Sequence, residues 1–298
     1  MTLVEQTPDT RSAIGAMDRK GRATSRGWGT LATYAILLGG ALITLGPFAL
    51  SIITSFKTPQ QFSTESPLSL PAPFTMQNYA GLFSGELVDF GHSIIVTAGY
   101  VLVVLVGQLT FSILAAFAFA RLRFPGRDVL FWLYLSTLMI PAVVTVVPLY
   151  LMLTEAGLRN TFWGIVLPYM FGSPYAIFLL REYFRGIPEE IVDAARIDGA
   201  GTWRILTRIM VPLSRPIIVT LTIITIVTHW NNFLWPLIIT GSPSLSVITV
   251  ATASMQSQYN GNWTIVMAAT TLAMAPLIII FLIFNRQIVN SIAITSFR

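Results

Sequence analysis

The sequence predicts an all-α integral membrane protein with six transmembrane helices and both termini in the cytoplasm. Apolar side chains make up 54% of the 298 residues, charged ones only 10%, and the mean hydropathy is +0.71. Several apolar runs are about 20 residues long, which is the length that an α-helix needs to cross a bilayer. The basic residues are also sorted between alternate segments of the chain, as expected for a multi-span protein.

The apolar runs define the domain organisation. The first run is too long for a cleavable signal peptide, and a polar tail of residues 1–27 precedes it. This tail is rich in Thr, Ser, Arg and Gly, so we expect it to be a disordered cytoplasmic segment, with residues 28–298 as the transmembrane domain. Pro141 and Pro148 should kink the third span. The predicted spans are residues 29–55, 92–120, 128–153, 162–181, 214–240 and 263–285.

Lys and Arg set the orientation of these spans. Of the 18 basic residues, 16 fall in the N-terminal tail, the turn 121–127, the loop 181–215 or the C-terminal segment. The alternate loops hold only Lys57 and Arg159. This asymmetry places both termini inside the cell. A nucleic-acid-binding patch would not sort by membrane side, so the net charge of +5 does not indicate nucleic acid.

The residues that are missing exclude several kinds of chemistry. There is no cysteine and there are only two histidines, so we expect no metal site and no catalytic residue. No P-loop or nucleophile-elbow motif occurs, so the chain is not expected to be an enzyme or to bind ATP itself. A proton-coupled secondary carrier is a less favoured alternative, because no acid lies in the interior of a predicted span.

A charged segment, residues 187–212, interrupts the apolar chain before the fifth span. Pro188 suits a first helical position, and Glu189 and Glu190 favour the positive end of the helix dipole. Ile191, Ala194 and Ala195 share one face of this helix. The alanines would let another backbone approach closely, as at a docking surface.

A turn and a second helix follow. Gly199 stands where a helix C-cap requires positive φ, and Thr202 is suited to cap a helix that runs to Pro212. The segment is therefore predicted to be a helix, a glycine turn and another helix on the cytoplasmic side. An ordinary basic loop is the alternative interpretation.

The spacing of this segment resembles the EAA loop of permease subunits from bacterial ABC importers. The family pattern is Glu-Ala-Ala, three residues, Gly, nine residues and Ile-x-Leu-Pro. The present chain keeps every spacing, with Asp193 for Glu and Val211 for Leu. The resemblance implies that loop 182–213 couples to an ATPase subunit docking on helix 189–201. The coupling residues it implies are Glu189, Glu190, Asp193, Ala194, Ala195, Asp198, Gly199, Ile209 and Pro212.

Four further stretches resemble the maltose-permease inner-subunit branch of that family: SFKTPQQF (55–62), NYAGLF (78–83), ARLRFPGR (120–127) and HWNNFLWPLI (229–238). The resemblance implies the type I ABC importer permease fold, in the bacterial cell membrane, and transport of a sugar or oligosaccharide delivered by an extracytoplasmic solute-binding protein. The implied partners are a second homologous permease and two ATPase subunits, which would hold ATP and Mg. Import of glycerol phosphate or a polyol ester is the nearest alternative, and an integral membrane enzyme is a more distant one.

The fifth span carries the candidates for a translocation path. Thr222, Thr225, His229 and Asn232 fall within an arc of about 80° on a helical wheel. Such a polar face is costly against lipid, so it should face the bundle or a water-filled path. Hydroxyl and amide groups beside an aromatic ring suit sugars. The alternative is that these side chains only hold helices together.

Overall fold

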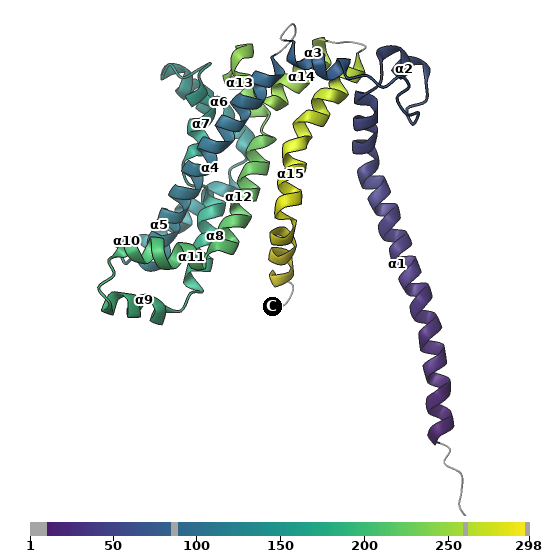
Figure 1. Cartoon of the computed structure of the whole chain (residues 1–298). Helices are drawn as coiled ribbons and strands as arrows, with labels where there is room; N and C mark the ends of the chain where they lie inside the picture. The colour runs from purple at the N-terminus through teal and green to yellow at the C-terminus, as the bar shows by residue number, and fades with distance from the viewer. Residues whose placement is uncertain (1–10, 85–88, 259–261, 296–298) are drawn as a thin grey trace, which may run out of the picture.

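The computed structural model describes residues 11–84, 89–258 and 262–295, and the side chains of residues 29–84, 89–256 and 262–285 (Figure 1). Throughout the described residues, every regular element is helical. The elements are α1 (Arg11–Ser55), α2 (Pro59–Thr64), α3 (Gln77–Phe83), α4 (Phe90–Arg121), α5 (Arg127–Ser136), η1 (Thr137–Met139), α6 (Ala142–Glu155), α7 (Phe162–Met170), α8 (Pro174–Arg185), α9 (Glu189–Ile197), α10 (Thr202–Ile205), η2 (Leu206–Met210), α11 (Val211–Leu213), α12 (Arg215–Trp230), α13 (Leu234–Ile239), η3 (Pro243–Leu245), α14 (Ile248–Gln258) and α15 (Trp263–Thr295).

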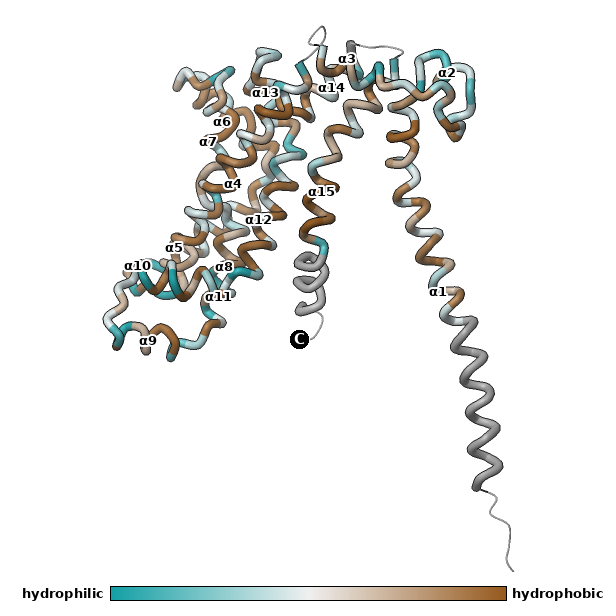
Figure 2. The backbone as a smooth tube through the Cα atoms, viewed as in Figure 1, coloured by the Kyte–Doolittle hydropathy of each residue, from teal (hydrophilic) through white to brown (hydrophobic). Residues whose placement is uncertain are grey.

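Four helical segments within the described residues are long and apolar enough to span a bilayer without a sharp bend: Gly29–Ser55, Phe90–Arg121, Phe162–Arg185 and Trp263–Asn285. Two further candidates are bent pairs, α5–η1 with α6 at 101° and α10–α11 with α12 at 78°. The predicted all-α membrane architecture is confirmed, with six spans if each bent pair crosses once. Figure 2 shows the apolar residues concentrated along these helices.

The third predicted span, 128–153, is wrong as a single kinked helix, because it breaks into two pieces. The first piece ends at Met139, and Ile140 takes an extended conformation with φ −82° and ψ 117°. Pro141 follows and precedes α6. Proline lacks an N–H donor and pushes the residue before it out of the helical region, which explains the break.

The fifth predicted span, 214–240, is too long. Helix α12 ends at Trp230, and residues 231–233 separate it from the short helix α13. The Asn231 amide donates back to the Val227 carbonyl at 2.8 Å, a side-chain bond that competes with helix continuation. Trp235 and Ile239 of α13 are buried, so this segment packs into the bundle and does not extend the span.

The N-terminal boundary also differs. Helix α1 begins at Arg11, within the segment predicted to be a disordered tail of residues 1–27. Residues 1–10 of that tail lie outside the described residues. The boundary expected near residue 28 therefore falls within a helix, and the disorder of residues 1–27 stays a prediction.

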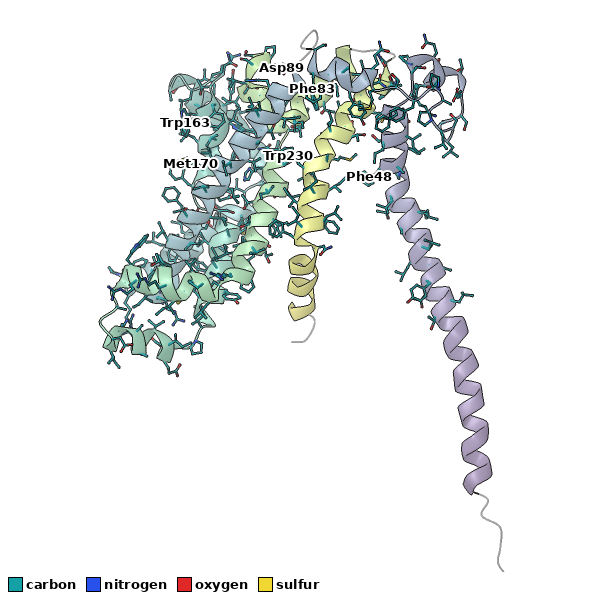
Figure 3. All side chains as sticks on the ribbon, in the orientation of Figure 1. Phe48, Phe83, Asp89, Trp163, Met170 and Trp230 are labelled. Carbon is teal, nitrogen blue, oxygen red and sulfur yellow. The ribbon has the colours of Figure 1, made fainter. Side chains whose placement is uncertain are left out.

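Helix α4 is the centre of the bundle and packs against α7, α8, α12 and α14. Gly107 permits the close approach of α7, since a Cβ atom there would lie 2.5 Å from the Met170 carbonyl oxygen. The core divides into two clusters. One includes Tyr100 and Trp235, and the other includes Phe184. Figure 3 places Trp230 between α12 and α15, where its indole N–H donates to the Ala273 carbonyl at 2.9 Å.

Helices α1 and α15 contact each other at one end of the molecule and diverge towards the other, the end that carries α9 (Figure 1). At the junction, the Asn78 amide donates to the carbonyls of Ser55 and Lys57, both at 2.8 Å, and accepts from the Thr264 hydroxyl at 2.9 Å. The Lys57 side chain is only 1% exposed. Its ammonium donates to the Ser69 hydroxyl at 2.9 Å and to the Ser66 carbonyl at 3.1 Å. These bonds fix the start of the loop after α1.

The cytoplasmic location of both termini stays a prediction. The N-terminal half of α1, the C-terminal half of α15 and helix α9 lie at the same end of the molecule in Figure 1. We call this the α9 end.

Candidate functional site

Helix α9 is the first half of the predicted coupling segment. It begins at Glu189, with Glu189 and Glu190 in its first turn. Pro188 is the N-cap, with φ −53° and ψ 137°, so it precedes the helix and does not occupy the first helical position as predicted. The acidic first turn lies at the positive end of the helix dipole, which stabilises it.

Gly199 makes the turn that ends α9. Its φ is 78°, the left-handed conformation that the spacing predicts. The N–H of Ala200 donates to the Ala195 carbonyl at 2.9 Å, which is the pattern of a glycine-terminated helix. Gly199 is exposed, and a Cβ atom added there would meet nothing within 4 Å. The requirement for glycine is therefore one of backbone conformation and not of space.

The second helix of the segment runs over Thr202–Leu213 and contains the π-helical turn η2. Thr202 does not cap it: the N-cap is Gly201, and no side chain caps the helix, so this prediction is wrong. Ile209 and Pro212 are half-buried, next to the fully buried Met210. The end of the EAA-like pattern thus packs towards the bundle, unlike α9.

The two sides of α9 differ sharply in exposure. Val192 is 2% exposed and packs into the core cluster at this end, and Ala195 is half-buried against the same cluster. On the other side Ile197 is 88% exposed, and we define the α9 outer face by its exposed residues Ile191, Ala194 and Ile197. Asp193 and Asp198 are also exposed, and Asp193 pairs with Arg196 at 2.9 Å.

Arg121 positions the segment that leads into α9. Its guanidinium donates to the Phe184 carbonyl at 2.6 Å and also to the Ile187 carbonyl. The end of α4 therefore fixes the end of α8 and the turn before α9. No function was predicted for Arg121 from the sequence. The available signal was its place in the stretch ARLRFPGR.

A polar cluster lies at the far end of α12 from α9. The Tyr100 hydroxyl bonds to His229 Nδ1 at 2.9 Å and accepts from the Asn232 amide at 3.0 Å. The rings of Tyr169 and His229 are 5.0 Å apart. Tyr100 is fully buried and His229 is 5% exposed. We call Tyr100, Tyr169, His229 and Asn232 the Tyr100 cluster. Tyr100 could not be selected from the sequence, because it lies in an apolar run of another helix.

The four predicted path residues do not form one open polar face in the chain alone. Thr225 and His229 are buried, while Thr222 and Asn232 are half-buried. The Thr222 hydroxyl donates to the Ile218 carbonyl of its own helix at 2.8 Å. The burial of Thr225 and His229 and the bond of His229 to Tyr100 agree with the alternative interpretation, helix packing, whereas a path lined by the four residues stays a prediction.

Among the residues that the structure describes, no three or more His, Cys, Asp or Glu side chains gather where they could hold a metal ion.

A multi-span helical bundle with a short, exposed helix in the loop at one end is typical of a membrane permease component. Residues 108–294 match the family described as "Binding-protein-dependent transport system inner membrane component", and the chain belongs to this family. It is a multi-pass inner-membrane permease, and the predicted resemblance to ABC importer permeases is confirmed.

Relatives cover nearly the whole chain. The diacetylchitobiose uptake system permease protein of Streptomyces coelicolor is 30% identical, over 89% of this chain and 88% of the relative. The sn-glycerol-3-phosphate transport system permease protein of Yersinia pestis is 32% identical, over 87% of this chain and 94% of the relative. The fold is shared with a bacterial ABC transporter involved in the import of alginate, with TM-score 0.78, 24% identity, and coverage of 88% of this chain and 97% of that one.

Proposed function

We propose that this chain is the permease subunit of an ATP-driven importer that translocates a sugar or oligosaccharide delivered by a solute-binding protein. A family of binding-protein-dependent components and a relative named for diacetylchitobiose uptake support this function. The assembly we propose contains a second, homologous permease and two ATPase subunits, and ATP and Mg bind to the latter.

The α9 outer face is the observation that carries the proposal. A short helix that is anchored by Val192 leaves Ile191, Ala194 and Ile197 without cover at the end of a membrane bundle. Exposed apolar side chains beside small ones suit the surface of a protein partner. We propose that an ATPase subunit docks here. Closure of the ATPase pair would then move α9 together with the bundle as a rigid body.

The fixed connection between α9 and the bundle supports this coupling. Arg121 links the end of α4 to the residues just before α9, and Val192 links α9 itself to the core. A displacement of α9 is therefore passed to α4, which packs against most of the other spans. Gly199 terminates α9 and defines its length.

We propose that two pairs of residues contribute to the translocation path in different ways. Thr222 and Asn232 line it, and Thr225 and His229 support the helix that carries them. The half-buried Thr222 and Asn232 retain surface that can face a path between two permeases. The buried Thr225 and His229 hold the helix that presents them, His229 through its bond to Tyr100. Hydrogen-bonding side chains near aromatic rings match the edges and faces of a sugar.

The glycerol-phosphate relative supports a second candidate substrate class. The predicted spans carry no Lys or Arg apart from Arg181 and Arg215 at their ends, which favours an uncharged solute for this subunit. Uptake of labelled chitobiose-type oligosaccharide and of labelled glycerol phosphate by cells that express the whole importer separates the two classes.

The test of ATPase docking is site-directed crosslinking. The chain has no cysteine, so Ala194→Cys introduces a single thiol on the exposed face of α9. We expect it to crosslink to the co-expressed ATPase subunit in a nucleotide-dependent way. Ala156→Cys is the matched control, since Ala156 is an exposed alanine that ends α6 far from α9.

Absence of the Ala194 crosslink in a fully assembled complex would overturn the docking assignment. A second result would overturn the proposal that ATP drives uptake. Uptake that survives ATP depletion but is abolished by an uncoupler would indicate a proton-coupled carrier.

A further inference from the structure

A cavity of about 280 Å³ lies at the α9 end, beside the turn that joins α4 to α5. Its walls come from the end of α4, from this turn, from the last turn of α8 and from α9. Its charged lining residues are Arg121, Arg123, Arg127, Arg185, Glu189 and Arg196. Five guanidinium groups and a single carboxylate therefore surround one small space.

The acidic side chains nearby neutralise only a small part of the positive charge of these arginines. Three of the arginines pair with carboxylates that do not line the cavity: Arg127 with Asp128 at 3.1 Å, Arg185 with Glu182 at 3.5 Å and Arg196 with Asp193 at 2.9 Å. All three acids are well exposed, and exposed pairs of this kind are weak.

The other two arginines have no acidic partner among the described residues. Arg121 bonds to the neutral carbonyls of Phe184 and Ile187, which position its charge without cancelling it. Arg123 is exposed and makes no ion pair in the described part of the chain. The cavity is therefore strongly positive.

The positive-inside rule does not account for this arrangement. It requires basic residues on one side of the membrane, but it does not gather them around a shared space. Arg204, Arg208 and Arg215 follow α9 in the same cytoplasmic loop and do not line the cavity. Five like charges that converge from separate segments repel one another, and a bound anion would relieve this repulsion.

We propose that this cavity binds a phosphate group, supplied by the headgroup of an anionic phospholipid in the cytoplasmic leaflet. Guanidinium groups present planar pairs of donors that match phosphate oxygens. Basic pockets at the ends of membrane helices on the cytoplasmic side are suited to anionic headgroups.

The surface of α5 next to the cavity suits the acyl chains of such a lipid. Val129, Trp132 and Leu133 share one face of α5 and are exposed, directly after Arg127. A lipid bound with its phosphate among the arginines would lie along this apolar face. Because Glu189 and Arg196 of α9 line the same cavity, the headgroup would also bridge α9 to the turn between α4 and α5.

The test uses the complete transporter, with its partner permease and ATPase subunits, in nanodiscs of phosphatidylcholine and phosphatidylglycerol. After extraction into detergent, native mass spectrometry counts the phosphatidylglycerol retained per complex. Arg123→Gln with Arg185→Gln should weaken retention about thirtyfold, because each basic side chain near an anionic lipid contributes about fivefold. Arg204→Gln with Arg208→Gln removes the same charge at the same end of the molecule, outside the cavity, and should retain lipid like the unmodified protein.

Two further measurements complete the test. One identifies the source of the phosphate, and the other serves if the double variant does not assemble. In phosphatidylcholine nanodiscs, inorganic phosphate is added instead. If it binds to the unmodified protein and not to the Arg123/Arg185 variant, while phosphatidylglycerol is not retained selectively, the phosphate site stands and the lipid source is overturned. Arg123→Gln alone, which removes a side chain without ion pairs, should weaken lipid retention about fivefold if the double variant does not assemble. Equal retention by all variants, or binding of neither probe, overturns the proposal.

Discussion

The Tyr100 cluster and the α9 outer face lie at opposite ends of the same bundle, and they differ in how the chain holds them. The Tyr100 cluster is held by hydrogen bonds between side chains of α4, α12 and the residues after α12, all within the core. Helix α9 is held by one buried side chain and by bonds from Arg121 to backbone carbonyls. Positioning through the backbone leaves the side chains of α9 free for a partner, whereas the Tyr100 cluster uses its side chains internally.

The largest effect expected at the α9 end comes from Gly199→Val. A non-glycine residue in the left-handed region costs about 1–2 kcal/mol, and a β-branched one more, so uptake should fall at least about tenfold. Membrane insertion should be unchanged. Gly201→Val is the matched control, because Gly201 has an extended conformation with φ −70° and ψ 163° that valine adopts readily. Equal uptake by the two variants would show that the turn at Gly199 does not matter for coupling.

Arg121→Gln tests whether α9 is positioned through the backbone. Loss of a hydrogen bond from a charged donor costs about 1.5–3 kcal/mol, so we expect uptake to fall about tenfold. The loop around α9 should also be cleaved faster by trypsin. Arg208→Gln is the control, since this exposed side chain lies on the loop after α9 and makes no hydrogen bond or ion pair with α8 in the described part of the chain. Normal uptake together with unchanged proteolysis of Arg121→Gln would contradict the role of Arg121.

Tyr100→Phe addresses the other end of the bundle. It removes the hydroxyl that joins His229 to Asn232 and leaves the buried His229 and the half-buried Asn232 without this partner, which should lower the free energy of unfolding by about 1–3 kcal/mol. Uptake per folded transporter should change little. Thermal unfolding in detergent, measured beside uptake normalised to folded protein, separates the two effects. A large change in the apparent affinity for solute at normal stability would instead show that the Tyr100 hydroxyl acts on the solute directly and not by holding α12 in place.

The smallest effect on transporter properties is expected from Ile197→Ala. Comparing it with Val192→Ala separates the docking side of α9 from its anchored side. Because Ile197 is 88% exposed, its truncation should leave the stability of the free permease unchanged and weaken ATPase binding about fivefold. Val192→Ala, at the buried position of the same helix, should lower stability instead. Calorimetry of the permease and titration of the ATPase subunit give the two quantities. If both variants behave alike, α9 does not have one anchored side and one docking side.

Much of the fold could be predicted because the bilayer imposes a length on each apolar run. The breaks inside the third and fifth spans could not be located in this way, since hydropathy continues across them. At Pro141 the sequence did indicate a kink, but the 101° angle depends on how α6 packs afterwards. Residues 231–233 end α12 through local side-chain bonds that a hydropathy pattern does not report.

The same distinction applies to the site. Gly199 could be predicted because its role is local: the turn needs a positive φ at one position. Arg121 and Tyr100 could not, because Arg121 bonds to carbonyls more than sixty residues away and Tyr100 to a histidine 129 residues away. Helical periodicity put Thr225 and His229 on one face, and both are buried in the chain, but it could not distinguish a buried helix contact from a water-filled path.

The junction of α1 and α15 has a mechanical consequence. Among the described side chains, the bonds of Asn78 and that between the hydroxyls of Ser51 and Thr271 at 3.5 Å join the two helices at the end away from α9. Over Gly29–Ser55 a helix is about 40 Å long, so a tilt of about 5° at the junction moves its far end by about 3.5 Å. Such a tilt would let α1 follow the proposed partner permease over several ångströms while the bonds at the junction, acting as a fulcrum, move little.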